Sequence, residues 1–290
     1  MEYSIEDWVE NASKETETFR QAVHIILTAI SSSKYLKPKM IMKGGILLGI
    51  RYKSSRFTTD IDFSSAEKLA DIDQEEFVEE LDESLSIASS ELPYRIKCLV
   101  QSVKVQPKDE NATFPSFNLK IGFASQDNLG QMKRLNDRSS PSVVKIDYSL
   151  NEMTYNTDEI TLEGEDDQSI SAYSFTDLVA EKIRSTIQQP YRGRNRRQDI
   201  YDLHHLLTTC KEVSEEEKLL ILTSLIKKSV GRIEPIEDVN KDTLDREDIR
   251  AMSETNYYLL ASEVAGELPE FSDAYTLIQS FYKSLPWDSI

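Results

Sequence analysis

The chain has 290 residues and a formal net charge of −17, with 51 acidic residues against 34 basic ones. Hydrophobic residues make up 39 % of it, which is typical of a globular protein and excludes a disordered chain. The negative charge argues against a general nucleic-acid coat protein, because contact with RNA or DNA then requires a local basic patch.

The N-terminal segment and the cysteines indicate a cytoplasmic protein. Residues 1–17 contain neither the basic region nor the apolar region of a signal peptide. No apolar run approaches the roughly 20 residues of a membrane span. Cys98 and Cys210 lie far apart and form no metal or redox motif, so a reducing compartment fits best. We expect a cytoplasmic protein that makes no contact with a membrane.

The first part of the chain predicts alternating helices and strands. Apolar residues at three- and four-residue steps predict a helix, whereas alternation and β-branched residues predict a strand. A turn at Lys43-Gly44-Gly45 follows the first predicted strand. These patterns predict helices over 15–32, 46–53 and 73–92, and strands over 38–42, 58–64, 95–105, 116–125, 142–150 and 159–163.

The rest of the chain predicts helices. Residues 131–141 are polar and basic and predict a loop, and the pattern becomes helical from about residue 170. Ser174-x-x-Asp177 resembles a capping box, which marks the start of a helix. The predicted helices cover 174–187, 198–210, 214–230, 245–265 and 271–284. We therefore expect an α/β domain over 1–165 and an α-helical domain over 166–290.

Two acidic strand segments predict a metal site. Side chains alternate along a strand, so Asp60 and Asp62 project from one face and Lys145 and Asp147 from one face of another strand. If these strands are neighbours, three carboxylates converge beside a lysine. Hard carboxylate oxygens together with substrate phosphates suit Mg²⁺.

Two glycines predict a phosphate site next to these carboxylates. Gly44-Gly45 stand between a predicted strand and a predicted helix. Glycine lets an anion approach the backbone N–H groups closely, and a helix N-terminus favours negative charge. The order strand, glycines, helix, loop and D-x-D, with a later K-x-D, predicts a site for a metal and a nucleotide.

Four ordered segments resemble the motifs of the AbiEii/AbiGii nucleotidyltransferase toxins, in the DNA-polymerase-β-like superfamily. KGG with RFTTDIDF resembles motif I, VKIDYS the K-x-D motif II, LVAEKIRS the E-K motif III and RNRRQDIYDLHHL motif IV. The resemblance covers about residues 40–207. It implies an α+β fold, in which a polymerase-β-like mixed sheet with flanking helices precedes an α-helical C-terminal domain that carries motifs III and IV.

The resemblance also implies an activity and a set of site residues. Family members transfer a nucleoside monophosphate from an NTP with Mg²⁺; MenT-type toxins add it to tRNA, and others act beside an antitoxin in phage defence. Asp60, Asp62 and Asp147 would be catalytic and would hold the metal. The implied nucleotide-binding residues are Lys43, Gly44, Gly45, Arg56, Thr58, Thr59, Lys145, Lys182 and Asp199. Ile46 replaces the usual Thr or Ser after the glycines, so that phosphate contact is either missing or supplied by Thr58 or Thr59.

An arginine-rich run predicts the acceptor site. Residues 184–198 contain five arginines and no acid, although the chain as a whole is acidic. Such a run can grip the phosphates of an RNA. We expect Arg192, Arg194, Arg196 and Arg197, together with Lys133, Arg134 and Arg138, to border the acceptor side of the site.

Three functions remain open at this point. The first is a Mg²⁺-dependent nucleotidyltransferase toxin that acts on tRNA and has a cognate antitoxin. The second is a relative that binds nucleotide or docks an antitoxin without catalysis. The third is transfer of a nucleotide onto a protein or a small molecule, because the fold alone does not select the acceptor.

Overall fold

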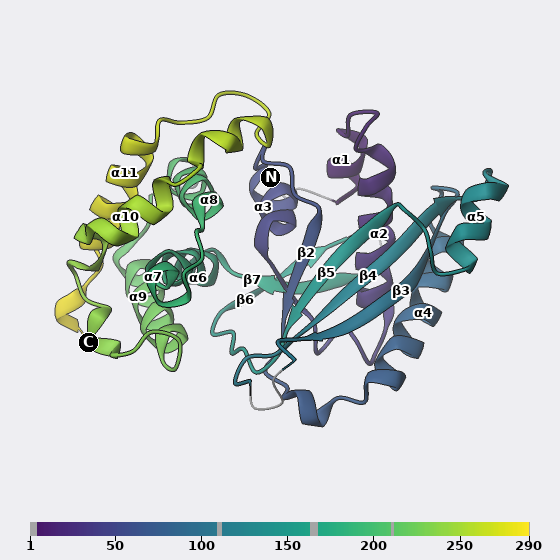
Figure 1. Ribbon diagram of the computed structural model, residues 1–290, viewed down its shortest axis with the longest axis horizontal. Helices are drawn as coiled ribbons and strands as arrows, with labels where there is room; N and C mark the ends of the chain where they lie inside the picture. The colour runs from purple at the N-terminus through teal and green to yellow at the C-terminus, as the bar shows by residue number, and fades with distance from the viewer. Residues whose placement is uncertain (1–4, 109–111, 163–167, 210–211, 290) are drawn as a thin grey trace. The chain divides into compact units, whose positions relative to one another are not determined.

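The chain forms two compact units. The structure, a computed structural model, describes residues 5–108, 112–162, 168–209 and 212–289 (Figure 1). Unit 1 comprises Met1–Arg51 and Thr59–Ala172, and unit 2 comprises Tyr52–Thr58 and Tyr173–Ile290. Glu163 and Cys210, the last residues of two predicted elements, lie outside the described residues.

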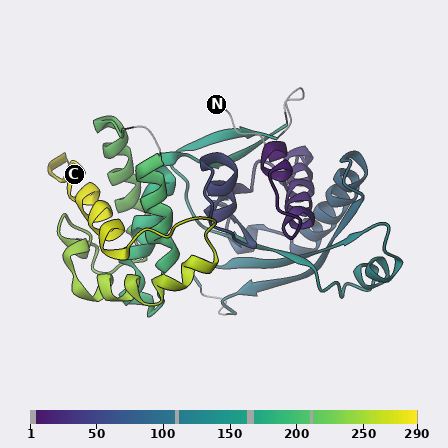
Figure 2. The same ribbon diagram turned by 90° about the horizontal axis from the view of Figure 1, so that it is seen from above.

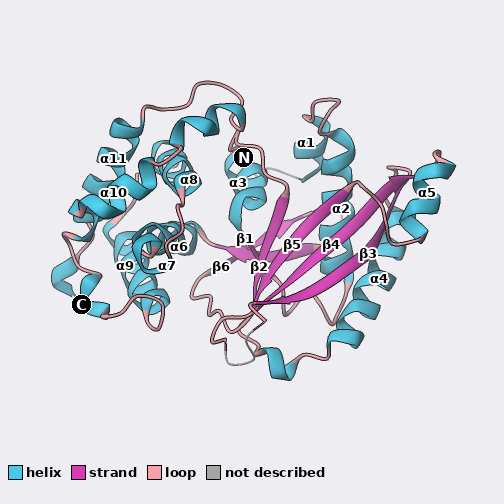
Figure 3. Cartoon of the chain, in the orientation of Figure 1, coloured by secondary structure: helices cyan, strands magenta, loops and turns pink. Residues whose placement is uncertain are grey.

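Unit 1 is built on a seven-stranded sheet with the order β3-β4-β5-β2-β1-β7-β6 (Figure 3). The pairing is mixed: β2 runs parallel to β5, β1 runs parallel to β7, and β3, β4 and β5 form antiparallel neighbours. The strands are β1 (Ile41–Lys43), β2 (Asp60–Ser64), β3 (Ile96–Gln106), β4 (Ser116–Ser125), β5 (Val143–Ser149), β6 (Thr157–Thr161) and β7 (Ser169–Tyr173).

Helices cover one face of this sheet. Phe77 of helix α4 stacks on Tyr148 of β5, with ring centroids 5.6 Å apart, and contacts Phe117 of β4. Helix α2 lies beside α4 on the same face (Figure 2). The described helices of this unit are α1 (Ile5–Glu10), α2 (Glu17–Ser32), α3 (Gly44–Tyr52), the 3-10 turn η1 (Leu69–Asp71), α4 (Gln74–Glu91) and α5 (Leu129–Asn136). The alternation of the strands leaves the opposite face polar, and we call it the open face.

Unit 2 consists of helices around the pair α6 and α9. Ser174 caps α6, its hydroxyl accepting a hydrogen bond from the N–H of Asp177, as the sequence predicted. The elements are α6 (Phe175–Ile187), α7 (Gln189–Arg192), α8 (Arg197–Thr209), α9 (Glu215–Ser229), α10 (Glu247–Glu254) and α11 (Phe271–Lys283), with 3-10 turns η2 (Ile236–Asp238), η3 (Thr243–Asp245), η4 (Tyr257–Ser262) and η5 (Trp287–Ser289).

The structure confirms the mixed α/β fold and most predicted elements but corrects three assignments. The predicted loop 131–141 begins as helix α5, because Asn128 caps it and Leu135 is buried. The predicted helix 245–265 is broken at Asn256, whose φ of 62° is left-handed. Residues 169–173, near the predicted start of the helical half, instead form β7, which pairs with β1. Among the described residues, no helix is long and apolar enough to cross a membrane.

A buried histidine makes unit 1 sensitive to acid. His24 of α2 is fully buried, with Nδ1 2.8 Å from the hydroxyl of Tyr94, and its Nε2 has no partner among the described residues. Burial lowers the pKa of His24 to about 4. In the unfolded chain the same ring titrates near its ordinary value of about 6.5. Between these two values the unfolded state binds more protons, so stability falls as the pH falls.

We predict that lowering the pH from 7 to 5 costs about 2 kcal/mol of unfolding free energy through His24 alone. The variant His24→Gln removes the titrating ring and should lose less stability over the same interval. Urea unfolding at both pH values, followed by circular dichroism, measures the difference. An equal loss in both proteins would show that His24 does not titrate as its burial requires.

Candidate active site

Strand pairing brings the carboxylates of motifs I and II together in unit 1. In the parallel pair β2 and β5, Asp60 lies opposite Lys145 and Asp62 lies opposite Asp147. Neighbouring strands are about 4.8 Å apart and opposite residues point to the same face. The expectation that the two acidic strands are neighbours is therefore confirmed, and Asp60, Asp62 and Asp147 share the open face.

Asp60 occupies the exposed part of this row. Its Oδ1 lies 3.6 Å from Nζ of Lys145, and both side chains are about half exposed, at 49 % and 55 %. The hydroxyl of Thr59 donates to the same oxygen at 3.0 Å. Water screens an ion pair this exposed, so a cation or a phosphate can replace either partner at little cost.

Asp147 has an oxygen that the fold leaves unsatisfied. Its Oδ1 is buried and has no hydrogen-bond partner among the described residues. A buried acceptor without a partner costs roughly 1–3 kcal/mol, so it marks a place where a ligand is expected. Asn118 of β4 lies directly opposite Asp147 and was not among the predicted site residues. The alternation in SFNLKIG indicates that Asn118 and Lys120 share a face, which is the signal that could have identified it.

These carboxylates have the hard oxygen atoms that a divalent cation prefers, although they do not surround a single position. In the described part of the chain, no three His, Cys, Asp or Glu side chains are clustered closely enough to hold a metal ion. The donor set consists of hard oxygens on one face, and one of them is unsatisfied. Mg²⁺ is usually held by one or two carboxylates with water and substrate phosphates, so a complete protein cage is not required.

Gly44 allows the backbone to pass close to Asp62. Its φ is +78°, and a Cβ added there would stand 1.9 Å from Oδ2 of Asp62. Only glycine combines this left-handed backbone with so close an approach. Helix α3 begins at Gly44, two residues before the position expected for the helix, so both glycines lie in its first turn. Ile46 is buried at 2 % exposure, and its side chain therefore serves the core.

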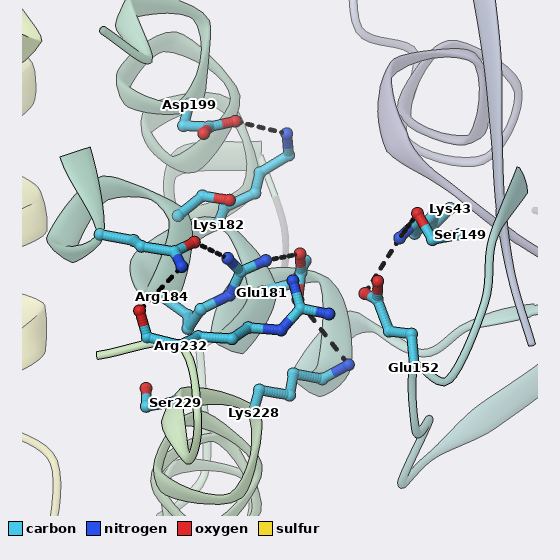
Figure 4. A network of polar contacts seen from close by, with 12 residues as sticks. Lys43, Ser149, Glu152, Glu181, Lys182, Arg184, Asp199, Lys228, Ser229 and Arg232 are labelled. Carbon is cyan, nitrogen blue, oxygen red and sulfur yellow. Dashed lines mark hydrogen bonds and ion pairs between the residues drawn. The ribbon is translucent and has the colours of Figure 1, made fainter. Parts of the chain in front are cut away.

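Lys43 has a partner within the fold. Its Nζ lies 3.0 Å from Glu152 and 3.2 Å from the hydroxyl of Ser149 (Figure 4). The side chains of Lys43 and Glu152 are 11 % and 6 % exposed. Lys43 also lies opposite Asp62 in the sheet. The structure thus places Lys43 in the same row as the carboxylates, and its contact with a nucleotide remains a prediction.

In unit 2, motifs III and IV meet in a buried ionic network. Lys182 of α6 pairs with Asp199 at 3.1 Å and with Asp202 at 2.7 Å (Figure 4 shows the first pair). Arg56 binds Asp202 through two hydrogen bonds of 2.9 Å. Asp202 is fully buried and was missing from the predicted site. The spacing of Asp199 and Asp202 by three residues places both on one face of α8, which could have revealed it.

The charges in this network stabilise one another. Burial alone would raise the pKa of Asp202, but Lys182 and Arg56 outweigh it and hold the pKa below its ordinary value. Burial opposes the charge of Lys182 as well, yet Asp202 and Asp199 raise its pKa. Asp202, Lys182 and Arg56 therefore stay ionised, and the network joins α6, α8 and the segment 52–58. Thr58 of that segment is partly buried.

The predicted acceptor arginines differ in their surroundings. Arg196 pairs with Asp199 at 3.4 Å, and Arg197 pairs with Glu263 at 3.0 Å. Arg192 and Arg194 are exposed and have no ion pair among the described residues. Burial and the neighbouring Arg184, Arg232, Arg196 and Arg194 lower the pKa of Arg192. The cations are therefore crowded, which favours binding of an anion at this point.

A second polar network lies close to these arginines. Arg184 is buried and bonds to Glu181 and Gln188, and Gln188 donates to the carbonyl oxygen of Arg232 at 2.9 Å (Figure 4). Lys228 of α9 lies 3.9 Å from Glu181. Arg184, although part of the arginine-rich run, is therefore held inside unit 2.

We predict that Gly44→Ala destabilises the protein by about 1–3 kcal/mol, because it adds left-handed strain and displaces the Asp62 carboxylate. Gly231→Ala is the matched control, since Gly231 has a φ of +69° and nothing within 4 Å of an added Cβ. Denaturant unfolding of both variants measures their free energies of unfolding. The loss in Gly231→Ala reports the backbone strain alone, and the extra loss in Gly44→Ala reports the clash with Asp62. Equal losses of stability in the two variants would show that the Asp62 side chain moves away from the added methyl group at no energetic cost.

We predict that Asp202→Asn costs about 3–5 kcal/mol at pH 7, because it leaves the buried Arg56 without its carboxylate partner and removes one of the two carboxylates that pair with Lys182. The pKa of Asp202 is lower in the folded protein than in the unfolded chain. Its contribution to the free energy of unfolding is therefore complete above the unfolded-state pKa and is lost as the pH falls through the folded-state pKa. Glu215→Gln breaks an exposed pair with Lys218 and should cost no more than about 1 kcal/mol. Thermal and urea unfolding test both. A loss for Asp202→Asn as small as that of the control would contradict this role.

Comparison with known proteins identifies the family. The chain matches the family described as nucleotidyl transferase AbiEii toxin, type IV TA system, over residues 25–277. It is similar to the crystal structure of JHP933 from Helicobacter pylori, with 13% identity, a TM-score of 0.50, and 95% of this chain and 93% of that chain covered. A structure named "putative nucleotidyltransferase from H. pylori" has 14% identity and a TM-score of 0.48, with 94% and 96% covered.

The JHP933 structure supports the fold only, because its identity to this chain is low. No curated protein matches the sequence. The family match covers most of the chain and includes the four motifs whose strands and helices are described above. The chain belongs to the nucleotidyl transferase AbiEii toxin family of type IV toxin–antitoxin systems.

Proposed function

We propose that this protein is a Mg²⁺-dependent nucleotidyltransferase toxin that transfers a nucleoside monophosphate from an NTP to tRNA. One observation carries the proposal. Asp62 and Asp147 lie opposite each other on parallel strands, and Asp147 keeps a buried oxygen without a partner in the described structure. Two adjacent carboxylates repel each other, and a cation that bridges them would relieve this repulsion.

The residues of unit 1 would have two roles, metal binding and phosphate binding. Asp60, Asp62 and Asp147 would hold Mg²⁺, which when bound neutralises charge on the phosphates. Lys145, opposite Asp60, and the N–H groups of the Gly44-Gly45 turn would bind the phosphate oxygens. Lys43, in the same row, would add positive charge, and Thr59 would supply a hydroxyl.

The reaction is a displacement at the α-phosphorus of the NTP. An acceptor hydroxyl oxygen forms a bond to that phosphorus, the bond to the bridging oxygen breaks, and pyrophosphate leaves. Asp147 would complete the metal site or help to accept the proton of the hydroxyl, through whichever carboxylate oxygen does not hold the metal.

The motif III and IV residues belong to unit 2, where their contacts differ from those of the residues in unit 1. Lys182, Asp199 and Arg56 are engaged in the buried network with Asp202. Their ion pairs favour a role in holding helices α6 and α8 in place. Contact of Lys182, Asp199, Arg56 or Thr58 with the nucleotide stays a prediction.

We further propose an acceptor contact in unit 2 and a cytoplasmic toxin with a cognate antitoxin. Arg192 and Arg194 are exposed and unneutralised in the described structure, which suits the phosphates of an RNA acceptor. Arg196 and Arg197 would have to exchange their carboxylate partners to take part. The family description as a type IV toxin favours an antitoxin counterpart. We also propose a role in phage defence, which the motif resemblance implies.

We predict that Asp62→Asn and Asp147→Asn lower nucleotide transfer by about 10²-fold or more, since each removes charge from the site of phosphoryl transfer. The assay incubates the protein with each labelled NTP, Mg²⁺ and either total RNA or a cell lysate. Glu79→Gln, which changes one exposed carboxylate of α4, is the control and should retain full activity. Removal of Mg²⁺ with a chelator should abolish transfer.

The labelled product separates the possible functions. Labelled tRNA supports the proposal. A labelled protein or small molecule keeps the nucleotidyltransferase and replaces the acceptor. NTP binding without any labelled product indicates the non-catalytic relative. Full transfer by Asp62→Asn would overturn the site.

A further inference from the structure

The open face of β3, β4 and β5 carries lysines in register with the carboxylates. Lys120 of β4 lies opposite Lys145 of β5, and Lys104 of β3 lies opposite Asn118 of β4. Asn118 in turn lies opposite Asp147. Residues opposite each other share a face, so these lysines begin directly beside the candidate active site.

The lysines on this face are not neutralised by the fold. Lys104 and Lys120 are exposed, and neither forms an ion pair or a side-chain hydrogen bond within the described ranges. Lys145 has only the long contact of 3.6 Å with Asp60. A lysine without a partner on a sheet face keeps its full attraction for a mobile anion.

Helix α5 adds further cations at the far end of the same face. Leu135 of α5 packs where Gly122 of β4 points, 3.0 Å from the position of an added Cβ. Gly122 shares its face with Lys120, because the two positions alternate along β4. Lys133 and Arg134 in the last turn of α5 are exposed and unpaired among the residues that the structure describes. Arg138, by contrast, is tied to Asp82 at 2.7 Å.

Charge is therefore separated across the sheet of unit 1. Helix α4, which packs on the opposite face through Phe77, contains seven acidic residues and no lysine or arginine, as its sequence QEEFVEELDESLSIASSE shows. The chain as a whole repels polyanions through its net charge of −17. The lysines of the open face attract a polyanion, whereas the acidic residues of α4 repel it from the opposite face.

The chemistry of this face favours phosphates over bases. The open-face positions of β4 and β5 are Ser116, Asn118, Lys120, Gly122 and Ala124, and Val143, Lys145, Asp147 and Ser149. None of them is aromatic, so the face cannot stack on bases as sequence-reading sheets do. Flexible lysine point charges suit the repeating phosphates of a nucleic-acid strand.

We propose that the open face of β3, β4 and β5 binds a single-stranded RNA end, with its phosphates over Lys120 and Lys104 and its terminal hydroxyl toward the three aspartates. This inference rests on the proposed function, which requires an acceptor hydroxyl at those aspartates. An RNA end carries a phosphate at each nucleotide that precedes its terminal hydroxyl. A protein hydroxyl carries no such series of charges, so this face favours the RNA.

The test measures RNA binding without catalysis. Fluorescence anisotropy with a labelled single-stranded RNA oligonucleotide, at several salt concentrations, compares wild type with Lys104→Ala/Lys120→Ala. Two lost phosphate contacts should weaken binding roughly tenfold or more at 0.1 M salt. They should also reduce the slope of log K against log salt by about 1.4. Two oligonucleotides of different sequence should bind alike.

The matched control is Lys14→Ala/Lys34→Ala. These two exposed lysines flank α2, which lies on the opposite face, and the charge change is the same. Binding by the control should equal that of the wild type. Thermal unfolding checks that both double variants remain folded, as expected for surface lysines.

The outcomes separate this proposal from the proposed function. Weaker RNA binding by the Lys104/Lys120 variant alone supports the proposal, even if no nucleotide is ever transferred. Equal binding by both variants overturns it, even if the wild type labels RNA. Displacement of the RNA by an acidic peptide of equal charge, at equal concentration, would overturn the choice of RNA.

Discussion

The parallel pairing of β2 with β5 is the constraint on which the candidate site depends. Its register places Asp62 opposite Asp147 and Asp60 opposite Lys145, so a shift of β2 by one residue would send Asp60 and Asp62 into the core. The register is fixed from the other face, because Ile61, Phe63, Ile146 and Tyr148 are buried there. Hydrophobic packing on one face therefore holds mutually repelling carboxylates together on the other.

Unit 2 also holds charged side chains close together, but there the charges are opposite in sign. Asp202 lies fully buried between Lys182 and Arg56, and Asp199 binds the same lysine. Such a network is a weak source of stability in itself, because each charge has lost its water. Its geometry is nevertheless restrictive, since removing Asp202 leaves the buried Arg56 without its carboxylate partner. We infer that it serves to fix α6 and α8, the two helices that carry motifs III and IV.

The open face connects the local charge pattern with the overall composition. A protein with a net charge of −17 can bind a polyanion only where its cations are gathered. The strand period of two sends Lys120 and Lys145 to the face of the aspartates, while the acids of α4 lie over the opposite face. One sheet thus separates the two kinds of charge within unit 1.

Local patterns in the sequence were enough to predict the fold class and most element positions, because alternation and helical periodicity are local properties. The sequence could not show that Asp147 keeps an unsatisfied oxygen or that Asp202 joins Lys182 to Arg56, since these depend on residues far apart in the chain. It also missed β7 and α5: β7 exists through its pairing with β1, and α5 rests on one buried leucine. Which cations are neutralised became visible only in the folded chain, because an ion pair requires two side chains to meet in space.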